Sequence, residues 1–222
     1  MTTDQEPAVA RVSDTRVSDS RASEARGSDR GAATRSGLLA AAREIFISEG
    51  YAQAGVTDIV ARAGASVGSL YHHYTGKADL YLALFDELHH HHAERTRRAV
   101  RRAREAGVTD PMQLFLAGAR AYLDASIDQH ELAGLFARGD GPPGFEVVWQ
   151  QRLTEWVSKN TEFFARSGEP LDEAVAIVMT GAMMLAVAEV SRADDSARAR
   201  QIADGVISVL SRLETRSQRC PS

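Results

Sequence analysis

The spacing of apolar residues after residue 34 constrains the fold of this chain of 222 residues more than any other feature. Apolar side chains recur at the i, i+3, i+4 and i+7 positions of an α-helix, and strand signals are absent. The first run extends from Thr34, a possible N-cap, to Gly50. Its apolar positions are Leu38, Leu39, Ala42, Ile45, Phe46 and Ile47. The pattern predicts an all-α protein.

Two short helical segments follow, with a tight turn between them. Residues 56–64 read VTDIVARAG and stop at Gly64, a residue type that is common at helix C-termini. Residues 67–74 read VGSLYHHY, and Ser66 stands directly before them, where a serine can cap a helix. A helix, a glycine-containing turn and a second helix predict a helix-turn-helix.

Residues 34–85 resemble the DNA-binding domain of TetR-family transcriptional regulators over their whole length, with no gap in the match. The resemblance is carried by residues 46–51, 58–60, 63–64, 68–71 and 76–77. It implies a three-helix DNA-binding domain at 34–86. It also implies a larger helical domain at 87–222 that binds a ligand and forms the dimer.

The second helix of the motif is expected to enter the major groove of DNA. Leu70 and Tyr74, four residues apart, are expected to face inward against the first helix. Gly68 leaves room where the helix backbone nears a phosphate, and neighbouring polar side chains are suitable donors to phosphate oxygens. The candidate DNA-binding residues, from this chemistry and the resemblance, are Arg35, Thr57, Ser66, Val67, Gly68, Ser69, Tyr71, His72, His73 and Lys77.

The chain departs from the TetR pattern at two places. Ala54 and Gly55 stand where the family usually has two threonines or serines, so the cap there is lost unless Thr57 substitutes. Val67 stands where a lysine, arginine or proline is common, and it can offer only an apolar contact such as one to a thymine methyl.

The whole chain carries a net charge of −4, so affinity for DNA must depend on placement and on the avidity of a dimer.

Residues 1–33 differ in composition from the rest of the chain. A pentapeptide of the form Arg-x-Ser-Asp/Glu-x is repeated almost four times from Arg11, with few apolar residues to bury. This composition predicts a disordered tail. An arm that reaches a DNA groove is one possible role, but acidic residues cancel the arginines and favour a solvated tail.

A long helix without proline is predicted from Lys77 to Gly107. The four histidines at 89–92 fan out by about 100° per residue, so they cannot all point at one metal ion. No HExxH or Cys-x-x-Cys motif accompanies them, which favours a solvated or pH-sensitive helix face over a metal site. Six arginines between residues 93 and 105 predict a solvated basic face, with phosphate contacts as the alternative.

The remaining chain predicts a helical bundle that could bind a ligand. Residues 110–113, DPMQ, form a capping box with proline at the first helical position. Further helices are expected at 131–137, 145–165, 171–190 and 197–213. Aromatic and methionine side chains could line an apolar cavity, although core packing also explains any one of them. The candidate ligand-binding residues are Phe115, Tyr122, Phe136, Trp149, Trp156, Met179 and Met183.

The last two predicted helices are rich in small residues such as Gly181 and Gly205, which let helices approach closely. An apolar face left over on terminal helices suggests a two-fold interface. The TetR resemblance likewise implies a homodimer that joins through these helices as a four-helix bundle. Two recognition helices related by a two-fold axis would read a palindromic operator.

The remaining signals bear on compartment and function class. Cys220 is the single cysteine, no signal peptide is visible, and the uncharged run at 174–188 is shorter than a bilayer requires. We therefore expect a soluble, cytoplasmic protein with no membrane partner and no cofactor. The predicted function is a ligand-responsive transcriptional repressor, not an enzyme. Two alternatives stay open: a metal-dependent enzyme that uses the histidines at 89–92, and a small-molecule-binding protein with a vestigial DNA-binding head.

Overall fold

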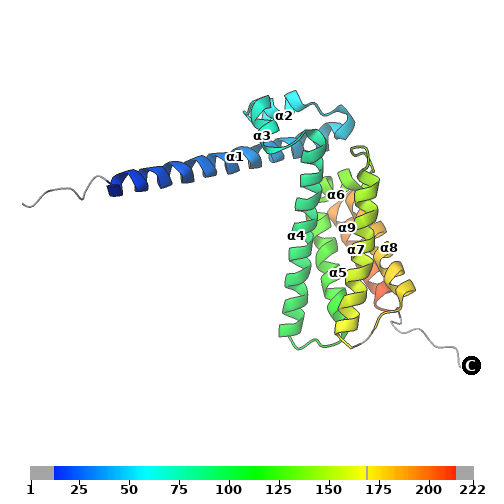
Figure 1. Ribbon diagram of the computed structural model, residues 1–222. Coiled ribbons are helices and arrows are strands. Elements are labelled where there is room, and N and C mark those ends of the chain that lie inside the picture. Colours follow the sequence, from blue (N-terminus) through cyan, green and yellow to red (C-terminus); the bar gives the residue numbers. More distant parts are fainter. Residues whose placement is uncertain (1–12, 169, 214–222) are drawn as a thin grey trace, which may run out of the picture.

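The computed structural model describes residues 13–168 and 170–213, and within these ranges the chain forms helices and no strand (Figure 1). The helices are α1 (Ser13–Gln53), α2 (Val56–Arg62), α3 (Val67–His73), α4 (Lys77–Glu105), α5 (Pro111–Asp128), α6 (His130–Ala137), α7 (Phe145–Arg166), α8 (Glu173–Arg192) and α9 (Ser196–Leu210). The predicted all-α class is confirmed. Helices α2 and α3 lie beside the end of α1, and α4 leads from them into a bundle with α5 to α9 (Figure 1).

Helix α1 begins earlier than the sequence suggested. A disordered tail was expected over residues 1–33, whereas the structure is helical from Ser13, and residues 1–12 lie outside the described residues. Figure 1 shows this helix projecting away from the rest of the molecule. A helix satisfies its own backbone hydrogen bonds, so a segment without apolar residues to bury can still be helical when no proline interrupts it. The domain boundaries at 33/34 and 86/87 stay predictions.

We use "head" for residues 34–86, and its core is closed around three aromatic rings. Gly50, with φ 81° and ψ 164°, interrupts α1 where the sequence predicted the helix to end. Beyond this break, Tyr51 folds back so that its ring centroid lies 5.7 Å from that of Phe46 and 5.2 Å from that of Tyr81. Ile59 of α2 and Leu70 of α3 are fully buried in the same cluster. These contacts fix α2 and α3 on the end of α1.

The same core continues from the head into the bundle. Tyr81 lies 4.9 Å from Phe136 and 5.1 Å from Phe145, measured between ring centroids. Phe85, one turn further along α4, makes ring contacts with both phenylalanines at 5.2 Å and 5.0 Å. The Tyr81 hydroxyl also donates a hydrogen bond to the Asp140 carbonyl at 3.0 Å. The head and the bundle are therefore joined by packed aromatic side chains as well as by the backbone of α4.

Helices α5 and α9 of the bundle begin at aspartate caps, of which the sequence predicted the one at Asp110. Asp110 accepts a hydrogen bond from the Gln113 backbone N–H at 2.7 Å, and Pro111 occupies the first turn of α5. Asp195 caps α9 in the same way, accepting from Arg198 N–H at 2.7 Å. Such caps satisfy backbone donors that the helix cannot pair internally. The predicted capping of α5 is confirmed.

Helix α8 is longer than the uncharged run that the sequence analysis considered. Among the described helices, it is long and apolar enough to cross a membrane by length and composition, a test that core helices of soluble proteins also pass. The sequence prediction counted only the uncharged run at 174–188, whereas the whole helix is longer. Here α8 packs against α6, α7 and α9.

Candidate nucleic-acid interface and ligand cavities

The start of α3 is fixed by a local cap. The backbone N–H of Ser69 donates to Ser66 Oγ at 3.1 Å, as the position of Ser66 in the sequence predicted. Leu70 is fully buried and Tyr74 is 3% exposed, so both face inward as expected. These two anchors determine which side of the short helix faces away from the protein.

The outward side of α3 carries most of the candidate DNA-binding residues. Val67 is 44% exposed and Tyr71 is 57% exposed, one helical turn apart. Ser66, Gly68 and His72 are also exposed, whereas Ser69 and His73 are half-buried. Val67 and Tyr71 therefore form an exposed apolar and aromatic strip on the side of α3 opposite Leu70, where a partner can reach them.

His72 and His73 do not form a chelating pair. Their ring centroids lie 4.9 Å apart with the planes at 72°, a packed edge-to-face arrangement. Within the described residues, no group of three or more histidine, cysteine, aspartate or glutamate side chains could hold a metal ion. The metal-dependent alternative therefore gains no support from the geometry of either histidine cluster.

Lys77 is engaged inside the protein rather than presented to a ligand. Its ammonium group donates to the carbonyls of Tyr51, Ala52 and Ala54 at 3.0, 3.2 and 3.1 Å. The ammonium nitrogen also lies 4.6 Å from the centroid of the Tyr51 ring. All three donors of the lysine are used, so it ties the end of α1 to the start of α4. The expected phosphate contact of Lys77 would require these bonds to break.

The two remaining head candidates lie beside α3 and at α2. Arg35 is exposed, and its guanidinium carbon lies 5.2 Å from the ring centroid of Tyr74, directly beyond α3. Thr57 is exposed in the first turn of α2, but it caps nothing, because the N-cap position is Gly55 and no side chain bonds there. Thr57 therefore does not replace the missing cap, and its hydroxyl stays accessible.

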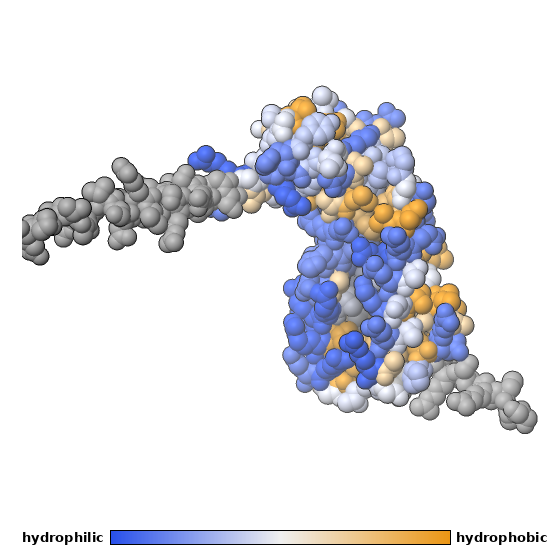
Figure 2. All heavy atoms as spheres, in the orientation of Figure 1, coloured by the Kyte–Doolittle hydropathy of each residue, from blue (hydrophilic) through white to orange (hydrophobic). Residues whose placement is uncertain are grey.

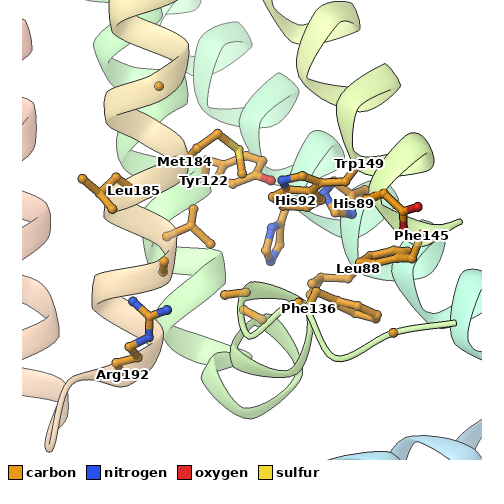
Figure 3. Close-up of a pocket in the computed structure, with 18 of the residues that line it drawn as sticks. Leu88, His89, His92, Tyr122, Phe136, Phe145, Trp149, Met184, Leu185 and Arg192 are labelled. Atoms are coloured by element: carbon orange, nitrogen blue, oxygen red, sulfur yellow. The ribbon is translucent and has the colours of Figure 1, made fainter. Parts of the chain in front are cut away.

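Two cavities lie among the described helices of the bundle, and we call them upper and lower by their distance from the head. The upper cavity, of about 720 Å³, lies between α4, α6, α7 and α8 and includes the loop before α7. Figure 3 shows Phe136, Phe145 and Trp149 on one side of it, with Met184 and Leu185 of α8 opposite. The predicted ligand residues Tyr122, Phe136 and Trp149 line this cavity. Phe136 and Phe145 also touch Tyr81, so one wall of the cavity belongs to the core of the head.

Two histidines of the cluster at 89–92 line the upper cavity, which the sequence analysis missed. His92 is 1% exposed and points into the cavity (Figure 3), and neither ring nitrogen has a hydrogen-bond partner in good geometry. His89 is half-buried, and its Nδ1 lies 2.8 Å from the Phe85 carbonyl, so Nδ1 carries the proton. Only His90 is exposed. The expected solvated face is therefore wrong for His89 and His92.

Burial keeps both of these histidines neutral. It lowers the pKa of His92 to about 3 and the pKa of His89 to about 4, because an apolar surrounding disfavours the charged imidazolium. Burial likewise raises the pKa of the Tyr122 phenol, whose ring lies 4.7 Å from that of His92. His89, His92 and Tyr122 thus offer uncharged hydrogen-bonding groups to the cavity, whose lining also includes Glu146 and Arg192. The i, i+3 and i+4 spacing of Tyr81, Phe85, Leu88 and His92 was the sequence signal that placed His92 on the buried stripe.

The lower cavity is larger, about 1000 Å³, and lies between α4, α5, α7 and α8. The predicted residues Phe115, Tyr122, Trp156 and Met183 line it, and Tyr122 and Met184 belong to the walls of both cavities. Met179 is fully buried in the packed cluster with Phe164 and Leu210 and lines neither cavity. The ligand prediction for Met179 is therefore not supported, because its helix face points into the core.

An apolar face of α8 and α9 is exposed. Ile177, Val178 and Leu185 of α8 are 54%, 55% and 65% exposed, and Val209 of α9 is 60% exposed. Gly181 lies between them on α8, with nothing within 4 Å of where a Cβ would stand. Large exposed apolar side chains that gather around a small residue fit a helix-to-helix contact with another molecule.

The head matches a known family of bacterial proteins. Residues 38–84 match the family model for bacterial regulatory proteins of the tetR family. FasR, an HTH-type transcriptional activator of Mycolicibacterium smegmatis, is 38% identical over 90 residues, 40% of this chain and 39% of FasR. TtgR, an HTH-type transcriptional regulator of Pseudomonas putida, is 39% identical over 59 residues, 27% of this chain and 28% of TtgR. The matched region therefore spans less than half of each relative.

Solved structures extend the likeness to the whole fold. A TetR-family transcriptional regulator from Pectobacterium atrosepticum is similar with a TM-score of 0.56 and 24% identity, covering 82% of this chain and 94% of that chain. A transcriptional regulator from Aquifex aeolicus has a TM-score of 0.60 and 15% identity, covering 79% and 99%. At this level of identity the bundle shares a fold with these proteins, and its ligand has to be argued from its own residues.

Proposed function

Because this chain carries the DNA-binding domain of the TetR family, we propose that it is a cytoplasmic transcriptional regulator that binds a palindromic operator as a homodimer and responds to a small ligand. The observation that carries the proposal is the outward face of α3, where Val67 and Tyr71 are exposed while Leu70 and Tyr74 are buried. A recognition helix needs this division between anchoring and reading residues.

The polar residues around α3 are proposed to position it on DNA. The Tyr71 hydroxyl, His72 and the Thr57 hydroxyl can donate to phosphate oxygens, and Arg35 adds a charge next to Tyr74. Val67 offers a contact to a thymine methyl in the major groove. Lys77 contributes indirectly, by holding the end of α1 against the start of α4.

The exposed apolar face of α8 and α9 is the proposed dimer interface. A two-fold contact places the same patch of both copies together, so Ile177, Leu185 and Val209 would be covered by their own symmetry mates. Two heads held at a fixed spacing can then engage two half-sites, which compensates for the lack of a basic excess in each head.

Ligand control is proposed to pass through the aromatic contacts between bundle and head. Phe136 and Phe145 line the upper cavity and also pack on Tyr81 in the core of the head. A ligand that displaces these rings shifts the balance between head positions that fit the operator and those that do not. We propose repression by occupation of the operator, with release when the ligand binds.

Selection of random DNA duplexes by the purified chain tests the proposal directly. We expect enrichment of a palindrome at low salt without ligand, and about a tenfold loss of affinity in Tyr71→Ala, because a phosphate or base contact is removed. Val147→Ala on α7, where Val147 is 55% exposed, is the matched control and should bind normally. If no palindrome is enriched, the proposed function is wrong. Transcription from a promoter with the enriched site distinguishes repression from activation.

Sedimentation tests the dimer separately. Leu185→Asp should shift the protein to the monomer, since it buries an unpaired charge at the interface in both copies. Val147→Asp places the same charge on an exposed apolar position of α7 and should leave the dimer intact. Equal dissociation in both variants, or in neither, would remove α8 and α9 as the interface.

A further inference from the structure

The lower cavity has a basic mouth, which the proposed function does not explain. Its charged lining residues are Arg97, Arg101 and Arg104 of α4 and Lys159, Glu162 and Arg166 of α7, five cations and one anion. The whole chain has a net charge of −4, so this concentration of positive charge is local. In Figure 2 hydrophilic side chains cover this part of α4, and apolar atoms show between them in the lower half of the bundle.

Two of these cations have no carboxylate partner among the residues that the structure describes. Lys159 pairs with Glu155 at 3.2 Å and Arg166 with Glu162 at 3.6 Å, and Arg97 pairs with Glu94. Within residues 13–168 and 170–213, Arg101 and Arg104 form no such ion pair, and the Arg104 guanidinium lies 5.9 Å from the Phe163 ring. Their charge is therefore available at the entrance of the cavity.

The interior behind this mouth is apolar. Phe115, Trp156, Phe163 and Met183 form much of the wall. Among the polar groups in the wall, the Asn160 amide donates to the Thr180 hydroxyl at 3.1 Å. A volume of about 1000 Å³ is at the upper end of cavities that hold small molecules. The wall thus favours a long apolar group that needs no hydrogen bonds.

We propose that the lower cavity binds an amphiphilic anion, with its apolar chain between α4 and α7 and its carboxylate or phosphate at Arg101 and Arg104. Arginine is suited to the head group because its planar guanidinium donates two parallel hydrogen bonds to an oxyanion. The inference rests on the ligand-responsive function proposed above and names the chemistry of the effector. Phe136 and Phe145 do not line the lower cavity, so an effector bound there reaches these rings only through Tyr122 and Met184, which line both cavities. Such a ligand wedges against α4, the helix that leads from the lower cavity to the head.

Direct binding of simple amphiphiles to the whole chain tests the inference. The probes are octanoate, dodecanoate and hexadecanoate, with dodecyl phosphate and dodecanol, each kept below its micelle-forming concentration and followed by calorimetry and by tryptophan fluorescence in a Trp149→Phe background, which leaves Trp156 as the single tryptophan. Among octanoate, dodecanoate and hexadecanoate, we expect affinity to rise about two- to fourfold per methylene until the cavity is filled, because each buried methylene contributes hydrophobic free energy. Comparing dodecanoate with dodecyl phosphate shows which head group the site prefers.

Paired arginine variants locate the head group. Arg101→Gln with Arg104→Gln should weaken dodecanoate binding by about tenfold or more and leave dodecanol unchanged. Arg98→Gln with Arg102→Gln is the matched control, because both arginines are exposed on α4 but do not line the cavity. Unfolding midpoints check that neither pair disturbs the fold.

Several outcomes overturn the inference without touching the DNA-binding proposal. These are equal affinity for dodecanoate and dodecanol, equal losses in the two arginine pairs, and binding only to vesicles of anionic lipid. Conversely, the chain could select no operator and still bind dodecanoate saturably through Arg101 and Arg104. That result would support the proposed amphiphile site and contradict the proposed function in transcription.

Discussion

The head and the bundle pack their aromatic side chains differently. In the head, Phe46, Tyr51 and Tyr81 fill a closed core around which short helices are fixed. In the bundle, Trp149, Trp156 and Phe115 are only half-buried and stand at the walls of two cavities. The packed core of the head therefore favours one arrangement of its helices, whereas the bundle keeps space between its helices.

The largest expected difference in stability follows from removing one aromatic ring from the head and, separately, one from the bundle. Phe46→Ala should cost about 3–5 kcal/mol of the free energy of unfolding, since the ring is fully buried and its loss leaves a cavity. Trp156→Ala should cost only about 1–2 kcal/mol, because its ring already borders open space. Urea unfolding followed by circular dichroism measures both. Similar costs for the two variants would mean that the bundle is as tightly packed as the head.

The pH dependence of stability separates the buried histidines of the bundle from the exposed histidine of the head. Burial lowers the pKa of His92 from 6.5 to about 3, so below about pH 6.5 the unfolded chain binds a proton that the folded chain does not. Stability should fall as the pH falls from 7 to 5, with a share on the order of 1–2 kcal/mol from His92. His92→Leu should remove that share, measured by unfolding at both values.

His72→Gln is the control for this comparison. His72 is exposed on α3, so its replacement should leave the difference in stability between pH 7 and pH 5 unchanged. If the stability of His92→Leu changes between pH 7 and pH 5 as much as that of the wild type, the ring of His92 is solvated in solution. An equal change in both variants would place the two histidines in similar surroundings.

The smallest expected effect on stability concerns helix capping in the head, where Ser66 caps α3 and no side chain caps α2. Ser66→Ala should cost about 1 kcal/mol, because the Ser69 N–H loses its acceptor at the start of α3. Thr57→Ala should change stability by less than about 0.5 kcal/mol, since no side chain caps α2. Thermal unfolding of the two variants provides the measurement. A larger cost for Thr57→Ala would indicate a hydrogen bond in solution that this structure does not contain.

Much of the fold followed from local sequence patterns. The start of α3 at Ser66, the break at Gly50 and the cap at Asp110 each depend on a few neighbouring residues, so they could be predicted one by one. The tail was predicted less well. Its helical part from Ser13 needs only backbone hydrogen bonds, and composition alone does not reveal whether these form.

The candidate sites divide in the same way. Exposed positions on α3 such as Tyr71 were found from helix periodicity and the TetR resemblance. Lys77 was predicted to meet DNA, but in the folded chain its nearest acceptors are three carbonyls at the end of α1, far away in sequence. Met179 and Trp156 looked alike as apolar residues of helices, yet only Trp156 reaches a cavity.

By itself, the sequence determined the helical class, several helix ends such as Ser66 and Asp110, and the likeness of the head to the tetR family, because these depend on hydrogen bonds and spacings within one or two turns. The tertiary structure alone decided which charges and rings meet. It turned His92 inward, assigned Lys77 to the backbone of α1 and set Arg101 and Arg104 at the mouth of a cavity. Those placements arise from packing between helices far apart in the chain, where the register of one helix against another fixes what each side chain touches.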